Sequence, residues 1–520
     1  MVLDRARRHV TAVAWLGASL LALILALPAI RWEPLHADEI VTLRFARQPF
    51  HDIVRDIFLE RGGAPLHFFV ERVTLAWPGG LVGLRLPSVV FFLLALPAAG
   101  IVAERLLGRP AAVLVPLALA LAPLALRLST FGRMYSLYLA ATLWATVVAL
   151  WAARRGDTFG WATAGAGAGL LVYIHPAAPI VSVLVLVTGL LWAERSWRTM
   201  LRDAWPAALA LVLVQLPYYV YALGVLRDRY EVEVGAPRAQ PIRAAGRSVP
   251  EQSLLALGPD GTAGAVFAIV VAFAGLVWLA RTRPRVAVAL GLWVVMPVLF
   301  FSFVPTGTTF FFPRYLLPSL PFFLLLFVAG SLGLASLGRA GAAAGAALLA
   351  ILFVWQAVND VRRLDELRAL DLPEAASLAE DTDGERLFGA VGVGPFARRP
   401  PSLLDEYVLL ERDVRRAPER SPETLSAFVN ADAEPARGVW LFAGPSRQMA
   451  AARAQLENVS GVEVVSVSAS VVLVRSEMPL ASRSLVEQAA ALREAWLRVT
   501  PGDAEAQRLR RWARTALAGS

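Results

Sequence analysis

Long apolar runs alternate with short charged segments over the first two thirds of the chain. Each run holds about 17 to 24 residues without a charge, and about 20 apolar residues in a helix cross a bilayer. A further stretch, 158–193, is about twice as long as one span needs, and His175-Pro176 lies near its middle. We predict two helices with a tight turn there, for a total of about eleven spans. The single-span runs are 10–30, 86–103, 110–126, 134–153, 204–226, 261–280, 286–304, 315–338 and 340–359.

A different pattern occurs in the first loop, residues 31–85. Apolar residues recur from Phe50 to Phe58 at the spacing of one helix face, and charged residues take the other face. We therefore predict a short amphipathic helix suited to the membrane surface. Gly62-Gly63 ends this helix, and Pro65 opens a second one that runs to Trp77.

Beyond Asp360 the pattern becomes that of a small globular domain. Two helices close the chain, separated by a break and cap at residues 500–503. The predicted fold class is therefore an all-α polytopic membrane domain, residues 1–359, followed by a small α/β soluble domain, residues 360–520. Within that domain we predict strands at 387–393, 439–442, 462–467 and 471–474, and a helix at 446–456.

The composition agrees with this division, because 57% of the 520 residues are hydrophobic, 18% are charged and the mean hydropathy is +0.57. Charge is so sparse before residue 360 that the solvent of this protein must be partly lipid. The absence of cysteine excludes disulfides and thiolate metal sites. All 50 basic residues are arginine. They are scattered between the apolar runs, so we expect no nucleic-acid partner.

The short loops predict the orientation of the spans. If the N-terminus is cytoplasmic, almost every short inside loop is basic, as the positive-inside rule expects. The outside then receives the loops 31–85, 227–260 and 305–314, and an odd number of spans also places the C-terminal domain there. We therefore expect a multi-pass protein of the cell membrane. The inside arginines are Arg105, Arg109, Arg154, Arg155, Arg195, Arg198, Arg202, Arg281, Arg283, Arg285 and Arg339.

Two adjacent carboxylates, Asp38 and Glu39, stand just beyond the first span at the expected outer interface, with His36 nearby. One interpretation is structural, because acidic residues at a helix N-terminus cap the backbone and interact favourably with the helix dipole. The other is chemical, because a carboxylate within hydrogen-bond reach of an acceptor hydroxyl can serve as a general base. The residues alone leave both interpretations open.

Arginines next to aromatic residues form a second candidate feature on the outer side. Taken singly, an arginine at the end of a span more often anchors the helix at the interface. Outer-side arginines are less expected in short loops, however, and a guanidinium suits a phosphate oxygen through charge-assisted, bidentate bonds. Several of them converging would make a site for a lipid phosphate. The residues are Arg127, Arg133 with Tyr135, and Arg314 with Tyr315.

At least three of the five histidines, His36, His67 and His175, fall in the outer layer. His175 interrupts an apolar stretch at a turn, where a polar residue is either a functional group or a structural histidine with its hydrogen bonds satisfied. Together with Asp38 and Glu39, His36 and His175 could bind a divalent cation, but their spacing does not require one. We assign no metal site and no cofactor.

Motifs for other chemistry are absent, since the chain has no Walker loop, no GxGxxG after a strand and no HExxH. A transporter or flippase of lipid-linked saccharides is the main alternative to an enzyme, because it also needs many spans and interfacial arginines. It favours charged or broken helices near mid-bilayer and often an internal repeat. The sequence shows few mid-span charges and no obvious repeat. A non-catalytic scaffold or receptor is a third alternative.

Five segments occur in a fixed order between residues 10 and 330: "HADEI", "GGAPLHFFVERV", "LRLPSVVFFLLALP", "STFGRMYSLYLAATL" and "FPRYLLPSLPFFLLL". In order and placement they resemble the lipid-phosphosugar-dependent glycosyltransferases of the GT-C fold, in particular the bacterial protein mannosyltransferase and aminoarabinose transferase group. The chain departs from the family at two points. Phe131-Gly132 stand where many relatives carry a glutamate, and Gly63-Ala64 stand where a basic residue commonly precedes Pro-Leu.

This resemblance implies a reaction and a set of residues. An acceptor hydroxyl attacks the anomeric carbon of a sugar, mannose or similar, while polyprenyl phosphate leaves, so the transfer inverts the configuration. The implied partners are the polyprenyl-phosphate sugar, an extracytoplasmic lipid, polysaccharide or protein acceptor, and the bilayer. Asp38 would be the catalytic base, supported by Glu39 through its charge or a metal. The other implied residues are Arg133, Arg314, Tyr135, Tyr315 and Arg85 at the donor phosphate, and His36, His67 and His175 in the same cavity.

Overall fold

The computed structural model divides the chain into two compact units. The first consists of residues 1–27, 42–79 and 83–362, and the second of residues 28–41, 80–82 and 363–520. The residues that the structure describes are 2–33, 35–59, 63–76, 80–193, 195–233, 249–259, 261–303, 313–368, 385–388, 391–392, 415–417, 419, 421–431, 434–466, 468 and 471–518.

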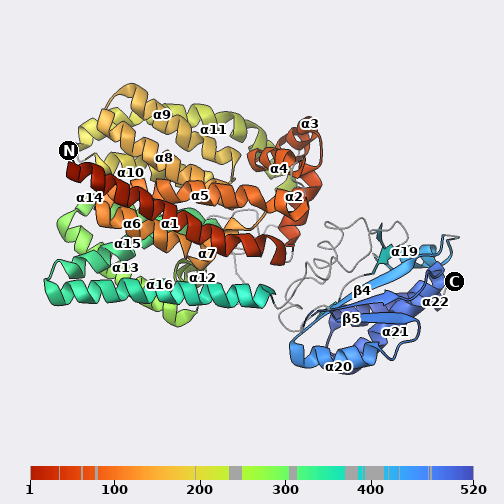
Figure 1. Ribbon diagram of the computed structural model, residues 1–520. Coiled ribbons are helices and arrows are strands. Elements are labelled where there is room, and N and C mark those ends of the chain that lie inside the picture. Colours follow the sequence, from red (N-terminus) through yellow and green to blue (C-terminus); the bar gives the residue numbers. More distant parts are fainter. Residues whose placement is uncertain are drawn as a thin grey trace. The chain divides into compact units, whose positions relative to one another are not determined.

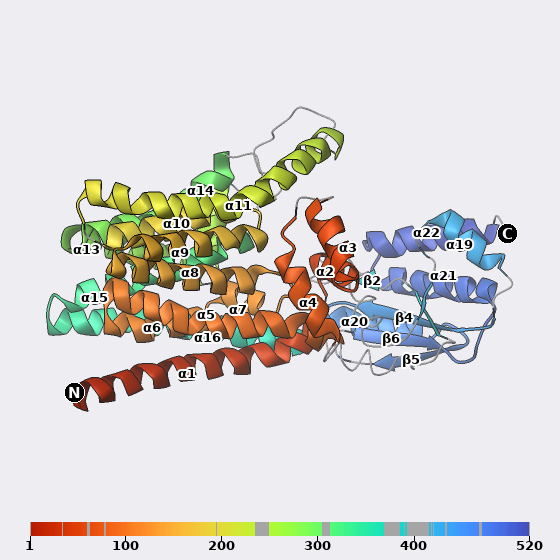
Figure 2. The same ribbon diagram turned by 90° about the horizontal axis from the view of Figure 1, so that it is seen from above.

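The first unit is a bundle of long helices that pack lengthwise against one another (Figures 1 and 2). Among the described residues, eight helices are long and apolar enough to cross a membrane, or nine if a bent pair counts as one span. The predicted polytopic helical membrane protein is thereby confirmed. The eight lie in α1 (Val2–Trp32), α5 (Gly80–Leu107), α8 (Tyr135–Arg155), α11 (Trp197–Glu233), α13 (Thr262–Thr282), α14 (Pro284–Phe303), the pair η3 (Pro313–Ser319) and α15 (Leu320–Ala335), and α16 (Arg339–Arg368).

Three of the predicted spans are interrupted or short. The run 110–126 is broken into two helices that are bent by 62°, because Pro123 has no N–H to continue the first helix and instead begins the second. The stretch 158–193 divides at His175, as predicted, into segments shorter than a bilayer requires. All predicted runs are therefore helical, although fewer than eleven reach bilayer length. The helices concerned are α6 (Arg109–Ala120), α7 (Pro123–Ser129), α9 (Thr158–Gly169), the 3-10 turn η2 (Leu170–Tyr173) and α10 (Ala178–Trp192).

Short helices occupy the first loop, and α3 and α4 lie at the end of the bundle away from the start of α1 (Figure 2). The predicted amphipathic helix is present, but its apolar side packs on protein, since Ile53 and Ile57 are buried against Phe45 and Phe68. Phe50, in contrast, is 52% exposed. The helices are α2 (Ala37–Ala46), α3 (Phe50–Ile53), the π-helical η1 (Val54–Leu59) and α4 (Leu66–Ala76); α12 (Val249–Leu257) follows much later in the chain.

Two glycines let α13 and α15 approach closely. A Cβ atom on Gly275 would lie 2.0 Å from the carbonyl oxygen of Leu326, and one on Gly330 would lie 2.2 Å from that of Val271. Only residues without a side chain permit this approach. Because α15 continues directly from η3, the contact fixes the helix whose first turns carry Arg314.

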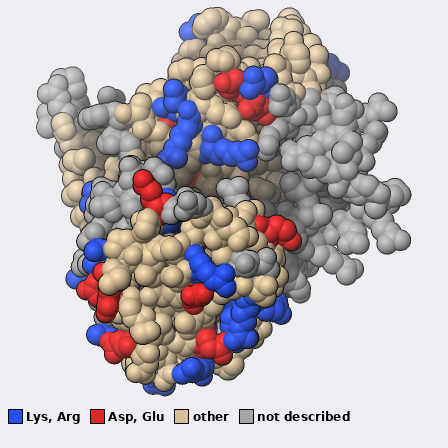
Figure 3. Space-filling view, turned by 90° about the vertical axis from the view of Figure 1, so that its right-hand side faces the viewer, with Lys and Arg blue, Asp and Glu red and all other residues tan. Residues whose placement is uncertain are grey.

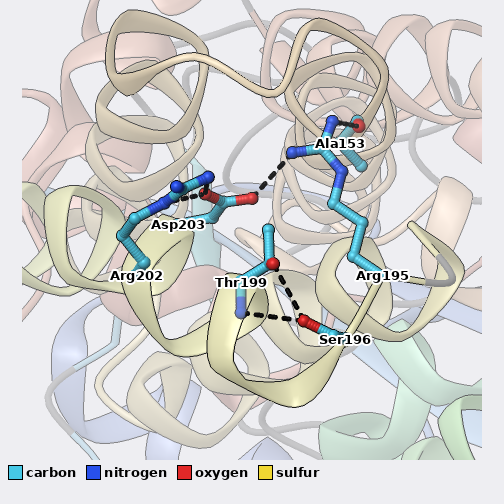
Figure 4. A network of polar contacts seen from close by, with 6 residues as sticks. All are labelled: Ala153, Arg195, Ser196, Thr199, Arg202 and Asp203. Atoms are coloured by element: carbon cyan, nitrogen blue, oxygen red, sulfur yellow. Dashed lines mark hydrogen bonds and ion pairs between the residues drawn. The ribbon is translucent and has the colours of Figure 1, made fainter.

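The basic loops meet at one end of the bundle, which we call the basic end. There, arginines donate hydrogen bonds to backbone carbonyls of other helices. Arg283 donates to the carbonyl of Leu106 at 2.9 Å. Arg195 donates to the carbonyl of Ala153 at 3.4 Å and forms an ion pair of 2.8 Å with the buried Asp203 (Figure 4). The loops after α5, α8, α10 and α13 are therefore tied together.

The second unit contains a sheet with the strand order β3-β1-β4-β6-β5, in which β2 also pairs with β4. Strand β4 is parallel to β1 and antiparallel to β6. Trp440, Phe442 and Val474 pack on the apolar sides of four helices. The strands are β1 (Glu385–Leu387), β2 (Val391–Gly392), β3 (Arg415–Arg416), β4 (Arg437–Ala443), β5 (Val462–Ser466) and β6 (Val471–Ser476), and the helices are α19 (Pro422–Val429), α20 (Ser446–Leu456), α21 (Ser482–Val499) and α22 (Ala504–Ala518).

The predicted break between the last two helices is a cap made by Asp503. Its carboxylate accepts hydrogen bonds from the backbone of Ala506 at 3.0 Å and from the indole of Trp496 at 2.8 Å. All four predicted strand runs contain strands, whereas β3 and α19 were not predicted. On the face shown in Figure 3, acidic and basic side chains are interspersed, as on the surface of an ordinary globular domain.

Candidate functional site

The acidic pair lies in the first turn of α2. Glu39 is buried, and its carboxylate accepts a hydrogen bond of 2.9 Å from the backbone N–H of His36. The backbone N–H of Asp38 donates to Nδ1 of His36 at 3.1 Å, and the Asp38 carboxylate lies 3.8 Å from the same nitrogen. The structural role considered for the acidic pair, capping a helix N-terminus, therefore applies to Glu39, whose carboxylate caps the helix that carries Asp38.

Arg133 stands in the tight turn between α7 and α8, and α5 holds that turn in place. The hydroxyl of Ser88 donates to the carbonyl oxygens of Phe131 at 2.6 Å and of Arg133 at 3.3 Å. A Cβ atom on Gly132 would lie 2.5 Å from Cγ of Leu84. A glutamate at position 132 would therefore collide with α5, which gives a physical reason for the glycine in this chain.

The Arg133 guanidinium itself points toward α2 and α4. Its Nη1 donates a hydrogen bond of 3.2 Å to the Thr42 hydroxyl, and its Cζ lies 5.9 Å from the centre of the Phe68 ring. Within the described part of the chain, Arg133 has no carboxylate partner, and its buried Nε has no hydrogen-bond partner. This half-buried guanidinium therefore keeps most of its capacity to bind an anion.

Arg314, in η3, packs on the same turn from the other side. Its Cζ lies 5.5 Å from the ring centre of Tyr135 and 5.9 Å from that of Phe131. The rings of Tyr135 and Tyr315 are 6.4 Å apart. The structure thus brings Arg314, Tyr135 and Tyr315 into one aromatic layer, whereas the Arg133 guanidinium, from the same turn, contacts Phe68 and Thr42.

His175 completes this layer from the turn between η2 and α10. Its ring stacks on Tyr138 at 5.0 Å and lies 5.5 Å from Tyr315. Nδ1 accepts a hydrogen bond of 3.1 Å from the backbone of Ala177, so the proton of the neutral ring is on Nε2. Burial, together with the charges of Arg133 and Arg314, lowers the pKa of His175 to about 3. The ring is therefore neutral at physiological pH.

His67 borders the same region from α4. It is 1% exposed, and its Nε2 lies 3.5 Å from a carboxylate oxygen of Glu71. Burial is the main cause that lowers the pKa of His67 to about 3, the charge of Arg133 adds to it, and the backbone of Gly132 opposes it. His67 is therefore a second neutral histidine beside a cationic arginine.

The arginines and the aromatic rings around this turn form what we call the arginine cluster, whose members are listed at the end of this paragraph. Arg85, a weaker candidate, is completely buried in α5, three residues before Ser88. His36 lies in the α2 turn with Asp38. Among the residues that the structure describes, no three His, Asp or Glu side chains gather closely enough to hold a metal ion. The arginine cluster consists of Arg133, Arg314, Phe131, Tyr135, Tyr315 and His175.

Several residues of this region were not singled out from the sequence. Spacing could have found three of them, since Thr42 follows Asp38, and Glu71 follows His67, by one helical turn, as Tyr138 follows Tyr135. Phe68 and Ser88 occur within the family-like segments, but nothing in the sequence alone predicts that they contact the turn at Arg133.

Comparisons with known proteins bear on the fold. No protein-family model matches the chain, and no curated protein matches its sequence. The crystal structure of ArnT from Cupriavidus metallidurans bound to undecaprenyl phosphate superposes with a TM-score of 0.50 at 16% identity, covering 88% of this chain and 97% of that one. The chain has a GT-C-like fold. The apo structure of the same ArnT gives a TM-score of 0.50 at 15% identity, covering 89% and 98%.

The GT-C likeness is wider than the sequence motifs suggested. A share of 88% of the chain exceeds the membrane domain, so the likeness extends into the C-terminal domain. An oligosaccharyltransferase from Archaeoglobus fulgidus, in its apo form, is also similar, with a TM-score of 0.46 at 11% identity, covering 82% of this chain and 69% of that one.

Proposed function

We propose that this protein is a membrane glycosyltransferase that takes a sugar from a polyprenyl-phosphate carrier. One observation carries the proposal: Arg314 packs on Phe131 and Tyr135, the residues that flank Arg133 in one turn, and Arg133 has no carboxylate partner among the described residues. A partly buried charge is costly unless an anion pairs with it. A lipid phosphate supplies that anion while its polyprenyl tail stays in the bilayer.

The fold supports the same proposal without deciding it. ArnT, which shares the fold, was crystallised with undecaprenyl phosphate. For the present chain, we infer a polyprenyl-linked donor with its phosphate between the two guanidinium groups. The neutral His175, with its proton on Nε2, would add an uncharged hydrogen-bond donor to that phosphate.

We propose that Asp38 is the general base. It precedes Thr42 by four residues in α2, so the two side chains project from the same face of that helix. Thr42 is in turn the hydroxyl that accepts from Arg133. Glu39, through its cap on α2, would position Asp38 rather than react, and His36, whose Nδ1 accepts from the backbone N–H of Asp38, would hold the first turn of that helix.

The chemistry is one displacement. The acceptor oxygen forms a bond to the anomeric carbon as the bond from that carbon to the phosphate oxygen breaks, and Asp38 takes the acceptor proton. General-base catalysis of this kind contributes about 10²- to 10⁴-fold. The departing phosphate gains negative charge, so the guanidinium groups stabilise the transition state more than the ground state. A single displacement inverts the anomeric configuration.

The proposed orientation follows the arginines. The basic end of the bundle lies in the cytoplasm, and the arginine cluster and the C-terminal domain face the other side of the membrane. The acceptor is then an extracytoplasmic hydroxyl of a lipid, a polysaccharide or a protein.

A transfer assay tests the function. The full-length protein would be reconstituted in liposomes with radiolabelled polyprenyl-phosphate sugars, mannose among them, and with candidate acceptors. We expect covalent transfer of label to an acceptor hydroxyl. Movement of the labelled lipid across the bilayer without covalent change would favour a flippase instead, and failure to bind polyprenyl phosphate at all would refute both.

A further inference from the structure

Two buried tyrosine hydroxyls near the arginine cluster have no hydrogen-bond partner among the described residues. They belong to Tyr138 in α8, which is 2% exposed, and to the half-buried Tyr219 in α11. The Tyr138 ring stacks on His175, and the ring of Tyr218, the residue before Tyr219, lies 5.8 Å from that of Tyr173, two residues before His175, so α8 and this part of α11 meet at the segment that carries His175. A buried hydroxyl without a partner destabilises a fold, and such groups therefore call for an explanation.

The neighbouring tyrosines do not share this property. The hydroxyl of Tyr173 donates a hydrogen bond of 3.0 Å to the carbonyl of Val214 in α11. One turn further along α8 from Tyr138, the fully buried Thr142 has a third hydroxyl without a partner in the described structure. Unsatisfied hydroxyls are therefore concentrated on one face of α8 and its surroundings.

The hydroxyl pair begins one ring away from the arginine cluster. The Tyr138 ring stacks on His175 at 5.0 Å with an interplanar angle of 12°, and the His175 ring lies 5.9 Å from Tyr135 and 5.5 Å from Tyr315 of the cluster. Tyr315 of the arginine cluster and Tyr138 are thus separated by the His175 ring alone along this stack of rings. No described carboxylate forms a hydrogen bond with either phenol.

We propose that the hydroxyls of Tyr138 and Tyr219 bind hydroxyl groups of the donor sugar and favour an uncharged sugar over an amino sugar. This rests on the proposed function. A phenol hydroxyl both donates and accepts, as sugar hydroxyls require, and aromatic faces pack against the apolar faces of a sugar ring. The ammonium of an amino sugar would find no carboxylate there and would lose its hydration without compensation.

The test is a binding measurement on the full-length protein in lipid nanodiscs with three probes: polyprenyl phosphate without a sugar, its mannosyl derivative and its aminoarabinosyl derivative. We expect the wild type to bind the mannosyl lipid more tightly than the other two. The double variant Tyr138→Phe/Tyr219→Phe should lose about 10- to 100-fold in affinity for the mannosyl lipid, about 10-fold per hydroxyl bond. Its affinity for the sugar-free lipid should stay within about twofold.

A matched control separates sugar binding from a structural role. The double variant removes no hydrogen bond of the free protein, so its melting temperature should not fall, whereas Tyr173→Phe removes one and should lower it without changing the preference for the mannosyl lipid. An unchanged preference in the double variant, or a preference of the wild type for the aminoarabinosyl lipid, would overturn the inference.

The proposed function is tested separately in the same experiment. If the wild type binds the sugar-free lipid and Arg133→Gln does not, the phosphate site is supported, whatever the result for the tyrosine variants. If the wild type binds none of the three lipids, the phosphate site and the sugar site both fall.

Discussion

Nη1 of Arg133 donates a hydrogen bond of 3.2 Å to the hydroxyl of Thr42, a residue 91 positions earlier in the chain. This bond joins the turn before α8 to α2, the helix whose first turn carries Asp38. It also fixes one edge of a guanidinium that has no carboxylate to orient it among the described residues. Thr42, together with the Phe68 ring, therefore sets the direction of Arg133.

Thr42→Val should reduce use of the lipid donor, because the guanidinium loses its neutral anchor while keeping its charge. We expect KM for the donor to rise about fivefold, the equivalent of about 1 kcal/mol for one hydrogen bond. Thr42→Ser keeps the hydroxyl and should behave like the wild type. Equal kinetics for the valine and serine variants would show that the bond does not position Arg133.

Asp38→Asn should abolish sugar transfer while expression and membrane insertion stay normal, because an amide cannot accept the proton of the acceptor. The expected loss in kcat is about 10²- to 10⁴-fold, measured in the liposome transfer assay. Asp52→Asn is the control, since Asp52 lies in the same loop but pairs with Arg55 at 2.9 Å. Normal turnover in Asp38→Asn would remove the residue from its role as base.

Arg314→Lys should weaken transfer although the charge is retained. A lysine presents one compact ammonium in place of the planar guanidinium that packs over Tyr135 and suits a phosphate in bidentate geometry. We expect a loss on the order of 10-fold in kcat/KM for the donor and on the order of 100-fold in Arg314→Ala, since one such contact is worth roughly 3 kcal/mol. Arg55→Gln, a change at an exposed arginine, should have no effect. Donor dependence that is unchanged in both Arg314 variants would exclude it from the phosphate site.

Lowering the pH should destabilise the protein through His67. The pKa of His67 is about 3 in the folded protein, chiefly because of burial, and 6.5 without it. Between these values the unfolded chain binds the proton and the folded protein does not. The free energy of unfolding therefore falls with falling pH across this window, by up to about 1.4 kcal/mol per pH unit from this residue.

The measurement is the melting temperature of the full-length protein at about pH 7 and about pH 5. In His67→Phe, which keeps a buried ring without a titrating group, the difference between the two temperatures should shrink. His51→Phe changes a histidine whose side chain is 79% exposed and should leave the difference as it is. If the melting temperatures of His67→Phe at the two pH values differ as much as those of the wild type, the acid sensitivity comes from other groups.

The C-terminal domain should depend on the ion pair between Arg493 and Glu419. Both side chains are buried, and the two bonds between them measure 2.6 Å and 2.7 Å. Glu419→Gln leaves the Arg493 charge buried beside a neutral partner, which should cost about 3–5 kcal/mol of stability. Limited proteolysis of the full-length protein should then cleave this domain faster. The exposed pair Arg483–Glu487 is the control, because Glu487→Gln should cost less than about 1 kcal/mol.

Much of the fold could be predicted from the sequence, because in lipid the length of an apolar run almost determines the helix. The run 110–126 shows the limit, since counting apolar residues does not reveal a bend at Pro123. In the C-terminal domain, the apolar runs predicted β4, β5 and β6, whereas the two residues of β3 are both arginine and have no apolar pattern to detect.

For the site, the sequence predicted the residues but not their relations. Arginine beside tyrosine is visible at Arg133 and at Arg314, but the packing of Arg314 and Tyr315 against Tyr135 depends on how α8 and η3 meet. That the hydroxyls of Tyr138 and Tyr219 lack a hydrogen-bond partner among the described residues could not be predicted either. Whether a hydroxyl has a partner is decided by neighbours from other helices, and periodicity in one helix carries no information about them.

At the basic end of the bundle, arginine has a structural role that lysine could not fill in the same way. Arg283 and Arg195 each cover a carbonyl near the C-terminal end of another helix, where the backbone has no partner of its own and the helix dipole is negative. One guanidinium has enough donors to hold two neighbours at once, as Arg195 does with Ala153 and Asp203. A lysine would keep the positive charge but would not bind both neighbours with the planar geometry of a guanidinium. The basic end of the bundle is consequently cross-linked by guanidinium groups, and on the proposed function we expect the helix movement that admits a lipid donor at the opposite end of the bundle.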